Sequence, residues 1–250
     1  MFIDTHCHIS TDYYENIDEV ILENNKHDVF KMIVSGCDDN SIKESLELID
    51  KYDCIYATIG YHPSEANLLD SIDYDLLENL ISNNKKIIGV GEIGLDYHYG
   101  DDRKEQIELF ERQLAIAEKL NLPVVIHSRE ATQDTINCLK KFKVKGVIHC
   151  FNGSLETASS YIKIGFKLGI GGVLTFKNCK LSETLEKIDV KNIVLETDSP
   201  YLTPVPYREK VNSSKYIPII AEKVAEIKNI SIQDLSKTIL NNTYEIFNIN

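Results

Sequence analysis

The sequence lacks the features that mark membrane, secreted and disulfide-rich proteins. It contains no run of about 18 apolar residues, so no membrane-spanning helix is expected. Its first residues show no basic segment followed by an apolar one, so no secretory signal is visible. The six cysteines include no Cys-x-x-Cys pair, and a chain of 250 residues needs no disulfide framework. We therefore predict free thiols, a cytoplasmic location and no membrane partner.

Basic residues are also in the minority. The chain has 27 lysines and arginines against 39 aspartates and glutamates, which gives a net charge of −12. This balance argues against non-specific binding to nucleic acid through a broad basic surface. It leaves open an enzyme that meets a phosphodiester through metal ions and a few local cations.

Short β-rich runs alternate with amphipathic segments along the whole chain. The predicted strands are Phe2–Thr5, Phe30–Ser35, Ile55–Ile59, Ile87–Val90, Pro123–Ile126, Gly146–Ile148, Phe166–Ile170 and Ile193–Leu195. The predicted helices are Tyr13–Asn24, Ser41–Lys51, Tyr74–Ser82, Arg103–Leu120, Gln133–Lys141, Leu155–Ile164, Leu181–Ile188, Ser214–Glu226 and Ile232–Phe247. This alternation favours a (β/α)8 TIM-type barrel, with an open doubly wound sheet as the alternative. No linker divides the chain, so residues 1–250 are predicted to form a single domain.

Polar side chains that bind metals stand at the ends of several predicted strands. They are His6, His8, Glu92, His127, His149 and Asp198. In a barrel the carboxyl ends of all strands meet at one mouth, where functional residues gather. Any one of these residues is more often a turn or core residue, but six at strand ends are hard to attribute to chance. Four imidazoles and two carboxylates suffice for two divalent ions, with Glu92 placed to bridge them.

Other polar residues near these strand ends have both a functional and a structural interpretation. Asp4 shares the face of His6 and is predicted to hold a histidine ring in place. Arg129 is predicted to grip a substrate phosphate, with a salt bridge to Glu130 or Glu92 as the alternative. Arg208 has the same two interpretations.

His62 is predicted either to donate to a substrate phosphate or to cap its turn. Asp96 is predicted to orient a loop or a ligand, and Glu196 to be structural or to support the ligands. Four aromatic residues near strand ends are candidates for stacking on bases or for packing, namely Tyr61, Tyr97, Phe151 and Tyr201.

Six motifs in chain order resemble those of the TatD family of metal-dependent deoxyribonucleases, within the amidohydrolase-like barrels. They are Asp4-Thr-His-Cys-His8, Gly60-Tyr-His-Pro63, Gly91-Glu-Ile-Gly-Leu-Asp96, Leu122-Pro-Val-Val-Ile-His-Ser-Arg129, His149-Cys-Phe-Asn-Gly-Ser154 and Leu195-Glu-Thr-Asp-Ser-Pro-Tyr-Leu202. The resemblance implies a binuclear site built by the six strand-end ligands. It also implies cleavage of DNA supported by Mg²⁺ or Mn²⁺, with Zn²⁺ often bound.

The sequence departs from the family pattern in the loop after Asp198. The family usually has Pro-x-x-Arg-Gly and then Asn-Glu-Pro, whereas this chain reads Pro206-Tyr-Arg-Glu-Lys-Val-Asn-Ser-Ser214. Arg208 and Asn212 remain, but Glu209 replaces the glycine. The extra carboxylate leaves substrate affinity and length preference open and does not affect the metal ligands.

The residues permit hydrolysis by a metal-activated water. Asp198 is predicted to bind metal and accept a proton, and Glu92 to bridge the ions. The first hypothesis is a deoxyribonuclease that trims DNA, favouring single-stranded ends. The second is a small-molecule hydrolase acting on a lactone, cyclic amide or phosphotriester, although that group often bridges its metals with a modified lysine. The third is a metal-binding or interaction protein without activity, and the complete ligand set argues against it. No protein partner is inferable.

Overall fold

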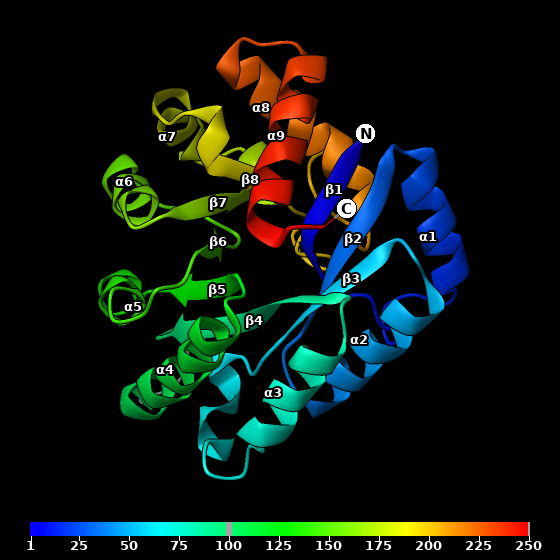
Figure 1. Ribbon diagram of the computed structural model, residues 1–250. Coiled ribbons are helices and arrows are strands. Elements are labelled where there is room, and N and C mark those ends of the chain that lie inside the picture. Colours follow the sequence, from blue (N-terminus) through cyan, green and yellow to red (C-terminus); the bar gives the residue numbers. More distant parts are fainter. Residues whose placement is uncertain (99–101, 250) are drawn as a thin grey trace.

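Eight parallel strands follow one another around a central axis in the computed structural model, which describes residues 1–98 and 102–249 (Figure 1). The strands are β1 (Phe2–Cys7), β2 (Val29–Gly36), β3 (Ile55–Ile59), β4 (Ile87–Asp96), β5 (Val124–Arg129), β6 (Gly146–Ile148), β7 (Phe166–Ile170) and β8 (Ile193–Leu195). Each strand pairs in parallel with the next one along the chain. The predicted (β/α)8 TIM-type barrel is confirmed, and the open doubly wound sheet is excluded.

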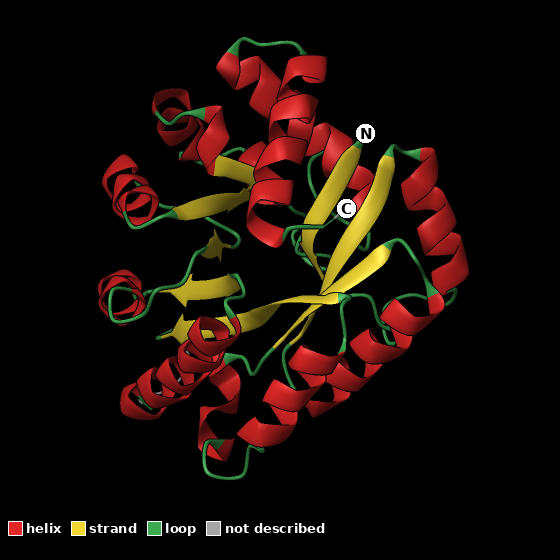
Figure 2. Cartoon of the chain, viewed as in Figure 1, coloured by secondary structure: helices red, strands yellow, loops and turns green. Residues whose placement is uncertain are grey.

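Helices lie on the outer side of the strands (Figure 2). The α-helices are α1 (Ile17–Lys26), α2 (Asp39–Lys51), α3 (Tyr74–Asn83), α4 (Arg103–Leu120), α5 (Thr132–Leu139), α6 (Leu155–Lys163), α7 (Leu181–Lys187), α8 (Ile217–Lys228) and α9 (Ile232–Phe247). Short 3-10 helices are η1 (Pro63–Leu68), η2 (Gly172–Thr175), η3 (Val190–Asn192) and η4 (Ser214–Tyr216). Among the described residues, none of these helices combines the length and the apolar character needed to cross a membrane.

Side-chain caps set where several helices begin. The first helix starts at Ile17 rather than at the predicted Tyr13, because the side chain of Asn16 accepts the backbone N–H of residue 19. The last helix starts as predicted, with the Ser231 hydroxyl accepting the N–H of Asp234. Residues 214–216, predicted to open α8, form η4 instead.

The barrel closes between β8 and β1 through the segment that follows β8. The backbone N–H of Asp198 donates to the carbonyl of His6 at 3.0 Å, and the N–H of His8 donates to the carbonyl of Ser199 at 2.7 Å. These two bonds continue the parallel pairing beyond the three residues of β8. They therefore place Asp198 directly beside His6 in β1 and His8 just after it.

Asp4 has a different role from the one the sequence predicted. Its buried carboxylate accepts the N–H of Thr197 at 3.0 Å and the Thr197 hydroxyl at 2.5 Å. It also accepts the backbone N–H of His6 at 3.3 Å, and within the described part of the chain none of its hydrogen bonds goes to a histidine ring. The prediction that Asp4 orients a ring was wrong, because the side chain is occupied in joining β1 to the segment after β8.

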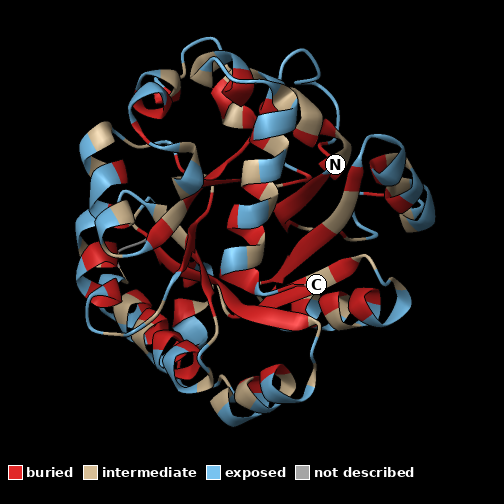
Figure 3. Cartoon of the chain, turned by 45° about the horizontal axis from the view of Figure 1, so that its top comes forward, coloured by how far each residue is buried: buried red, intermediate tan, exposed pale blue. Residues whose placement is uncertain are grey.

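A layer of branched apolar side chains fills the inside of the barrel on the side away from the mouth. The strands contribute Ile3, Ile33, Ile88, Val125, Val147 and Val194. Phe247 and Ile249, at the end of the chain, pack against this layer. Figure 3 shows the strands almost entirely buried. Because side chains alternate along a strand, His127, His149 and Glu196 point inward two residues after the valines of β5, β6 and β8.

Strands β1, β4 and β5 extend beyond their predicted ends and carry the polar residues inside the barrel. The pairing register shifts in β1 across the stretch that contains His6, and in β4 across the stretch that contains Glu92. Such irregularities turn individual side chains away from strict alternation. Gly94 in β4 has φ of +145°, and a Cβ atom there would collide with the carbonyl oxygen of His127. Glycine therefore lets β4 lie close against β5 at the mouth.

Candidate metal centre

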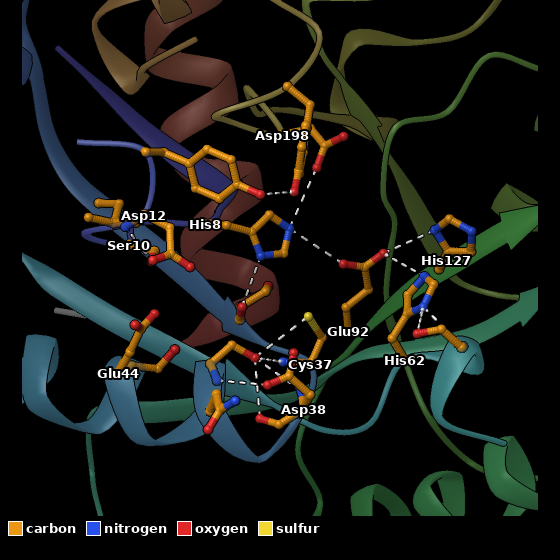
Figure 4. A pocket seen from close by; sticks show the side chains of 18 of the residues that line it. His8, Ser10, Asp12, Cys37, Asp38, Glu44, His62, Glu92, His127 and Asp198 are labelled. Carbon is orange, nitrogen blue, oxygen red and sulfur yellow. Dashed lines mark hydrogen bonds and ion pairs between the residues drawn. The ribbon is translucent and has the colours of Figure 1, made fainter. Parts of the chain in front are cut away.

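Glu92 lies at the centre of four histidine side chains, of which Figure 4 labels His8 and His127. Its Oε1 atom is 2.8 Å from Nε2 of His149 and 3.0 Å from Nδ1 of His127. Its Oε2 atom is 3.4 Å from Nε2 of His6 and 3.6 Å from Nε2 of His8. One carboxylate thus presents one oxygen to each pair of imidazoles, which is the arrangement expected of a bridging ligand.

Asp198 completes the group on the side of β1. Its Oδ1 atom lies 3.5 Å from Nε2 of His6 and 3.7 Å from Nε2 of His8. The residue has φ of +52°, in the left-handed region that aspartate enters more readily than most residues. The turn at Asp198 directs its carboxylate to the nitrogens that Glu92 also faces. The structure therefore brings together all six residues predicted as ligands.

Two of the histidines are held through the ring nitrogen that does not face the nearby predicted ligands. Nδ1 of His8 lies 3.0 Å from the carbonyl oxygen of Ser35, which can only accept a hydrogen bond. Nδ1 therefore carries the proton, and Nε2 offers a lone pair. His127 is held in the same way, with Nε2 3.0 Å from Oδ2 of Asp96. A ring fixed by an outer carbonyl or carboxylate is characteristic of metal-bound histidine.

Glu196 supports His149 from below. Its fully buried carboxylate accepts the N–H of Cys150, and its Oε1 atom lies 3.7 Å from Nδ1 of His149. The carboxylate packs against Gly169, where a Cβ atom would collide with Oε2. Glycine at that position leaves the space that Glu196 occupies. This placement agrees with the predicted supporting role of Glu196.

The buried polar atoms of this group fit a metal ion. Nε2 of His6 is buried and, within the described ranges, has no hydrogen-bond partner. Leaving a polar atom buried without a partner is unfavourable unless an ion or water satisfies it. Ligand atoms lie within 4.8 Å of one another in the sets His6–His149–Asp198 and His6–His8–Glu92. Imidazole nitrogen and carboxylate oxygen are suitable ligands for divalent ions, so the residues present fit a metal.

The charges of the site compensate one another. Burial alone would raise the pKa of Glu92, but His149 and His127 hold it well below its usual range. Burial also acts to raise the pKa of Asp198, and His6 and His8 lower it strongly. Conversely, burial acts to lower the pKa of His6, and the two carboxylates raise it to about 9. Without an ion, protonated imidazoles balance the carboxylates, and a bound ion would take over that role.

Metal uptake is expected to release protons at pH 7. Because the pKa of His6 is raised to about 9, its ring is protonated at pH 7 and must lose a proton before it binds an ion. Affinity should therefore rise as the pH rises from 6 to 8. Titration calorimetry with Mn²⁺, in two buffers of different ionisation enthalpy, measures the number of protons released. Equal heats in both buffers and equal affinities at pH 6 and pH 8 would contradict the prediction.

His62 presents a hydrogen-bond donor to the site. Its Nδ1 accepts the backbone N–H of Ser64 at 3.1 Å at the start of η1, so the proton lies on Nε2. Burial lowers the pKa of His62 to about 4, so the ring is neutral at pH 7. Nε2 is 3.8 Å from Oε1 of Glu92, and Figure 4 shows the two side chains next to each other. His62 thus caps its turn with one nitrogen and faces the predicted ligands with the other.

The two predicted substrate-binding arginines lie in different surroundings. Arg129 is exposed at the end of β5 and lines a cavity of about 450 Å³ that also reaches His127 and His149. Arg208 donates to the carbonyl of Thr203 at 2.9 Å, and its guanidinium carbon lies 3.9 Å from the ring centroid of Phe176. The structure therefore brings Arg129 next to the predicted ligands, whereas Arg208 is engaged within the loop after β8. The substrate contact of Arg208 stays a prediction.

Sequence reasoning missed Ser35, which contacts both His6 and His8. Its hydroxyl lies 3.0 Å from Nδ1 of His6, and its carbonyl holds His8. The only available signal was that Ser35 ends a predicted strand, and hence lies at the mouth. Of the predicted stacking residues, Tyr61 and Tyr97 donate to carboxylates and Phe151 is buried. Tyr201 is exposed at a cavity of about 540 Å³ that also reaches Glu92 and Asp198, which we call the main cavity.

Comparison with known proteins places the chain in a family. The profile of the family described as TatD related DNase matches residues 3–248. The relative named "Uncharacterized metal-dependent hydrolase YabD" from Bacillus subtilis is 38% identical over 256 aligned residues, which cover 100% of each chain. The crystal structure of the TatD homolog YjjV from Escherichia coli superposes with a TM-score of 0.90 at 29% identity, covering 100% of this chain and 98% of that one.

A TatD family hydrolase from Entamoeba histolytica superposes with a TM-score of 0.89 at 25% identity, over 98% of this chain and 97% of that chain. The match extends over nearly the whole length in every case, so it includes all the strand ends that carry the predicted ligands. The chain belongs to the TatD family of metal-dependent hydrolases.

Proposed function

We propose that this protein hydrolyses phosphodiester bonds of DNA, removing nucleotides from ends and favouring single strands, with two divalent ions as cofactors. The ions are Mg²⁺, Mn²⁺ or Zn²⁺. The observation that carries the proposal is the position of Glu92, with one oxygen facing His127 and His149 and the other facing His6 and His8. Two ions bridged by a carboxylate are a common arrangement in enzymes that cleave phosphodiesters. A cytoplasmic location is part of the same proposal.

The ligands divide into two groups around Glu92. His6, His8 and Asp198 would hold one ion, and His127 with His149 would hold the other. Ions bound there lower the pKa of water and offset the charge of a phosphoryl group. Ser35 and Asp96 bond to the outer ring nitrogens of His8 and His127 and so restrict their rotation, and Glu196 lies 3.7 Å from Nδ1 of His149.

Side chains of this protein would handle the proton and the phosphate. The carboxylate of Asp198 is ionised, because the neighbouring imidazoles lower its pKa, and it would accept a proton from the attacking water. Water oxygen would bond to phosphorus as the bond to the leaving sugar oxygen breaks, and that oxygen would take up a proton from solvent, while Asp198 later returns its own proton to solvent. The Nε2–H group of His62 would donate to a phosphoryl oxygen. Arg129 would bind the neighbouring phosphate with paired hydrogen bonds.

The alternative function is hydrolysis of a small lactone, cyclic amide or phosphotriester. Enzymes of that group often bridge their metals with a modified lysine, whereas β4 of this chain supplies Glu92 at the corresponding place. One observation favours a small substrate: the described residues lining the main cavity include no lysine or arginine. The two functions therefore have to be compared on the same preparation.

The proposed reaction is expected to require a divalent ion. Single-stranded and duplex oligonucleotides, labelled at either end, are incubated with Mg²⁺, Mn²⁺ or Zn²⁺, and in parallel with EDTA. We expect release of nucleotides with metal, faster from single strands, and none with EDTA. Chromogenic lactone and phosphotriester substrates are assayed beside them. DNA that stays intact with all three metals while a lactone or triester is hydrolysed would establish the alternative.

Replacing Arg129 by alanine is expected to weaken binding of DNA without removing metal. Loss of a charge-assisted contact of roughly 1.5–3 kcal/mol should raise KM by about 10- to 150-fold. Arg208→Ala is the comparison variant, and we expect it to have the smaller effect because Arg208 is not among the described residues that line the cavity with His127 and His149. A normal KM for Arg129→Ala would favour a structural ion pair for this residue instead.

A further inference from the structure

Two exposed tyrosines form a pair at the rim of the main cavity. Tyr13 lies between β1 and α1, Tyr201 follows β8, and they are 45% and 51% exposed. Their hydroxyl oxygens are 2.8 Å apart, and their ring centroids are 5.8 Å apart with planes at 75°. Each hydroxyl has the other as its partner. The apolar faces of the two rings are therefore what this pair offers to a ligand.

The pair stands close to the predicted metal ligands. The ring centroid of Tyr201 lies 6.4 Å from that of His8. A single cavity of about 540 Å³ extends from Glu92 and Asp198 to both tyrosines. Tyr207, farther along the loop, is also partly exposed, but it stacks on Tyr216 at 5.0 Å and does not line this cavity. Of these three exposed tyrosines, the pair is the one placed to meet a bound substrate.

The lining of this cavity is acidic. Asp12, Asp38 and Glu44 line it, and none of its described lining residues is a lysine or arginine. Figure 4 shows Asp12 and Glu44 on the side of His8 away from Glu92. A phosphate there would meet several carboxylates at once. The substrate part that extends past His8 toward the tyrosines must therefore be uncharged, and the phosphate chain must leave on the side of Arg129.

We propose that the region between His8 and the Tyr13–Tyr201 pair is a subsite for the terminal nucleoside of a DNA strand, with its base stacked on the two rings. The proposal rests on the proposed deoxyribonuclease function and adds the orientation of the substrate. Stacking on aromatic side chains accepts any base, because every base has a flat π surface. The acidic lining further specifies an end that carries a hydroxyl group rather than a phosphate.

The test compares an ordinary strand end with an abasic one. Tyr13→Leu and Tyr201→Leu are made singly and together, with Tyr207→Leu as the matched control. In the wild type, removing the terminal base should lower kcat/KM by about 5- to 100-fold. In the double variant the two substrates should be cleaved at nearly equal rates, whereas the control should keep the wild-type ratio. Tyr201→Phe keeps the ring and should retain the ratio to within about threefold.

A merely structural pair would give a different pattern. If the double variant loses activity equally on both substrates, or keeps the full preference for the base, the subsite is refuted. A second comparison adds a terminal phosphate, which should slow the wild type at least tenfold and slow Asp12→Asn/Glu44→Gln less. Equal rates on phosphorylated and hydroxyl ends would refute the orientation.

Failure of the subsite and failure of the deoxyribonuclease function give distinct results. Binding of a strand with a terminal 2-aminopurine and a non-hydrolysable phosphonate linkage at its end is followed by its fluorescence with Mg²⁺ present. The two tyrosines should quench the fluorescence of the bound base, and the double leucine variant should not. Quenching without cleavage under any metal would overturn only the proposed reaction. Cleavage with quenching unchanged in the double variant would overturn only the subsite.

Discussion

Replacing Asp198 by asparagine is expected to remove most turnover and leave the fold intact. The amide has the shape of the carboxylate, and the backbone N–H of residue 198 still donates to the carbonyl of His6. The amide cannot accept a proton as the carboxylate does, and it lacks the charge that faces His6 and His8. Loss of a proton acceptor lowers turnover by roughly 10²- to 10⁴-fold. The measurement is kcat on an end-labelled oligonucleotide at saturating metal, together with the melting temperature.

Glu130→Gln is the matched control for Asp198→Asn. Glu130 also lies at the mouth, at the end of β5, but its carboxylate pairs with His98 at 2.8 Å rather than with the predicted ligands. The same change from carboxylate to amide there should leave kcat within about twofold. An Asp198→Asn enzyme that keeps more than a tenth of its turnover would show that another group accepts the proton.

Replacing Glu92 by alanine is expected to remove at least one equivalent of bound metal. This carboxylate is buried and lies within 3.6 Å of a nitrogen of each of the four histidines. Without Glu92, no carboxylate lies between the four imidazoles to offset the positive charge of two closely spaced ions. The repulsion between the two ions then opposes binding of the second one. His127→Ala should remove metal on its own side only. Elemental analysis of the purified proteins measures the metal content, and activity should fall in parallel.

His62→Asn is the control for these two variants. His62 also faces Glu92, at 3.8 Å, but its Nε2 carries a proton because Nδ1 accepts the N–H of Ser64. Its removal should leave the metal content unchanged. Glu92→Gln, which keeps the shape of the side chain, separates loss of metal from loss of folding. Unchanged metal content in both Glu92→Ala and His127→Ala would refute the predicted ligand set.

Most of the barrel was predictable from local pattern. Four strands, β3, β6, β7 and β8, have the ends that the sequence predicted, because each is a short apolar run bounded by polar or turn residues. β4 was predicted to end at Val90 and in fact continues to Asp96. The missing part contains the glycines and Glu92, which are unfavourable in an isolated strand. Pairing with β5 overrides that preference, because the closely packed backbones need residues without side chains.

The candidate ligands were also predictable, but their supporting contacts were not. A histidine or aspartate just after an apolar run is recognisable in a sequence, and parallel strands bring such ends to one mouth. Asp4 illustrates the limit, because its partner Thr197 is 193 residues away along the chain. Ser35 is a second example, since no pattern identifies a carbonyl that holds a histidine ring.

The sequence by itself determined the order of strands and helices, the apolar layers, and which residue types stand at the strand ends. These properties depend on side-chain periodicity, which is a local quantity. Only the tertiary structure decided that Glu92 faces all four histidines, that Asp198 lies beside His6, and that Arg208 is engaged within its own loop. Each of those outcomes depends on register shifts and on contacts between segments far apart in the chain. Such contacts form only when the barrel closes, so they cannot be predicted from the local sequence pattern.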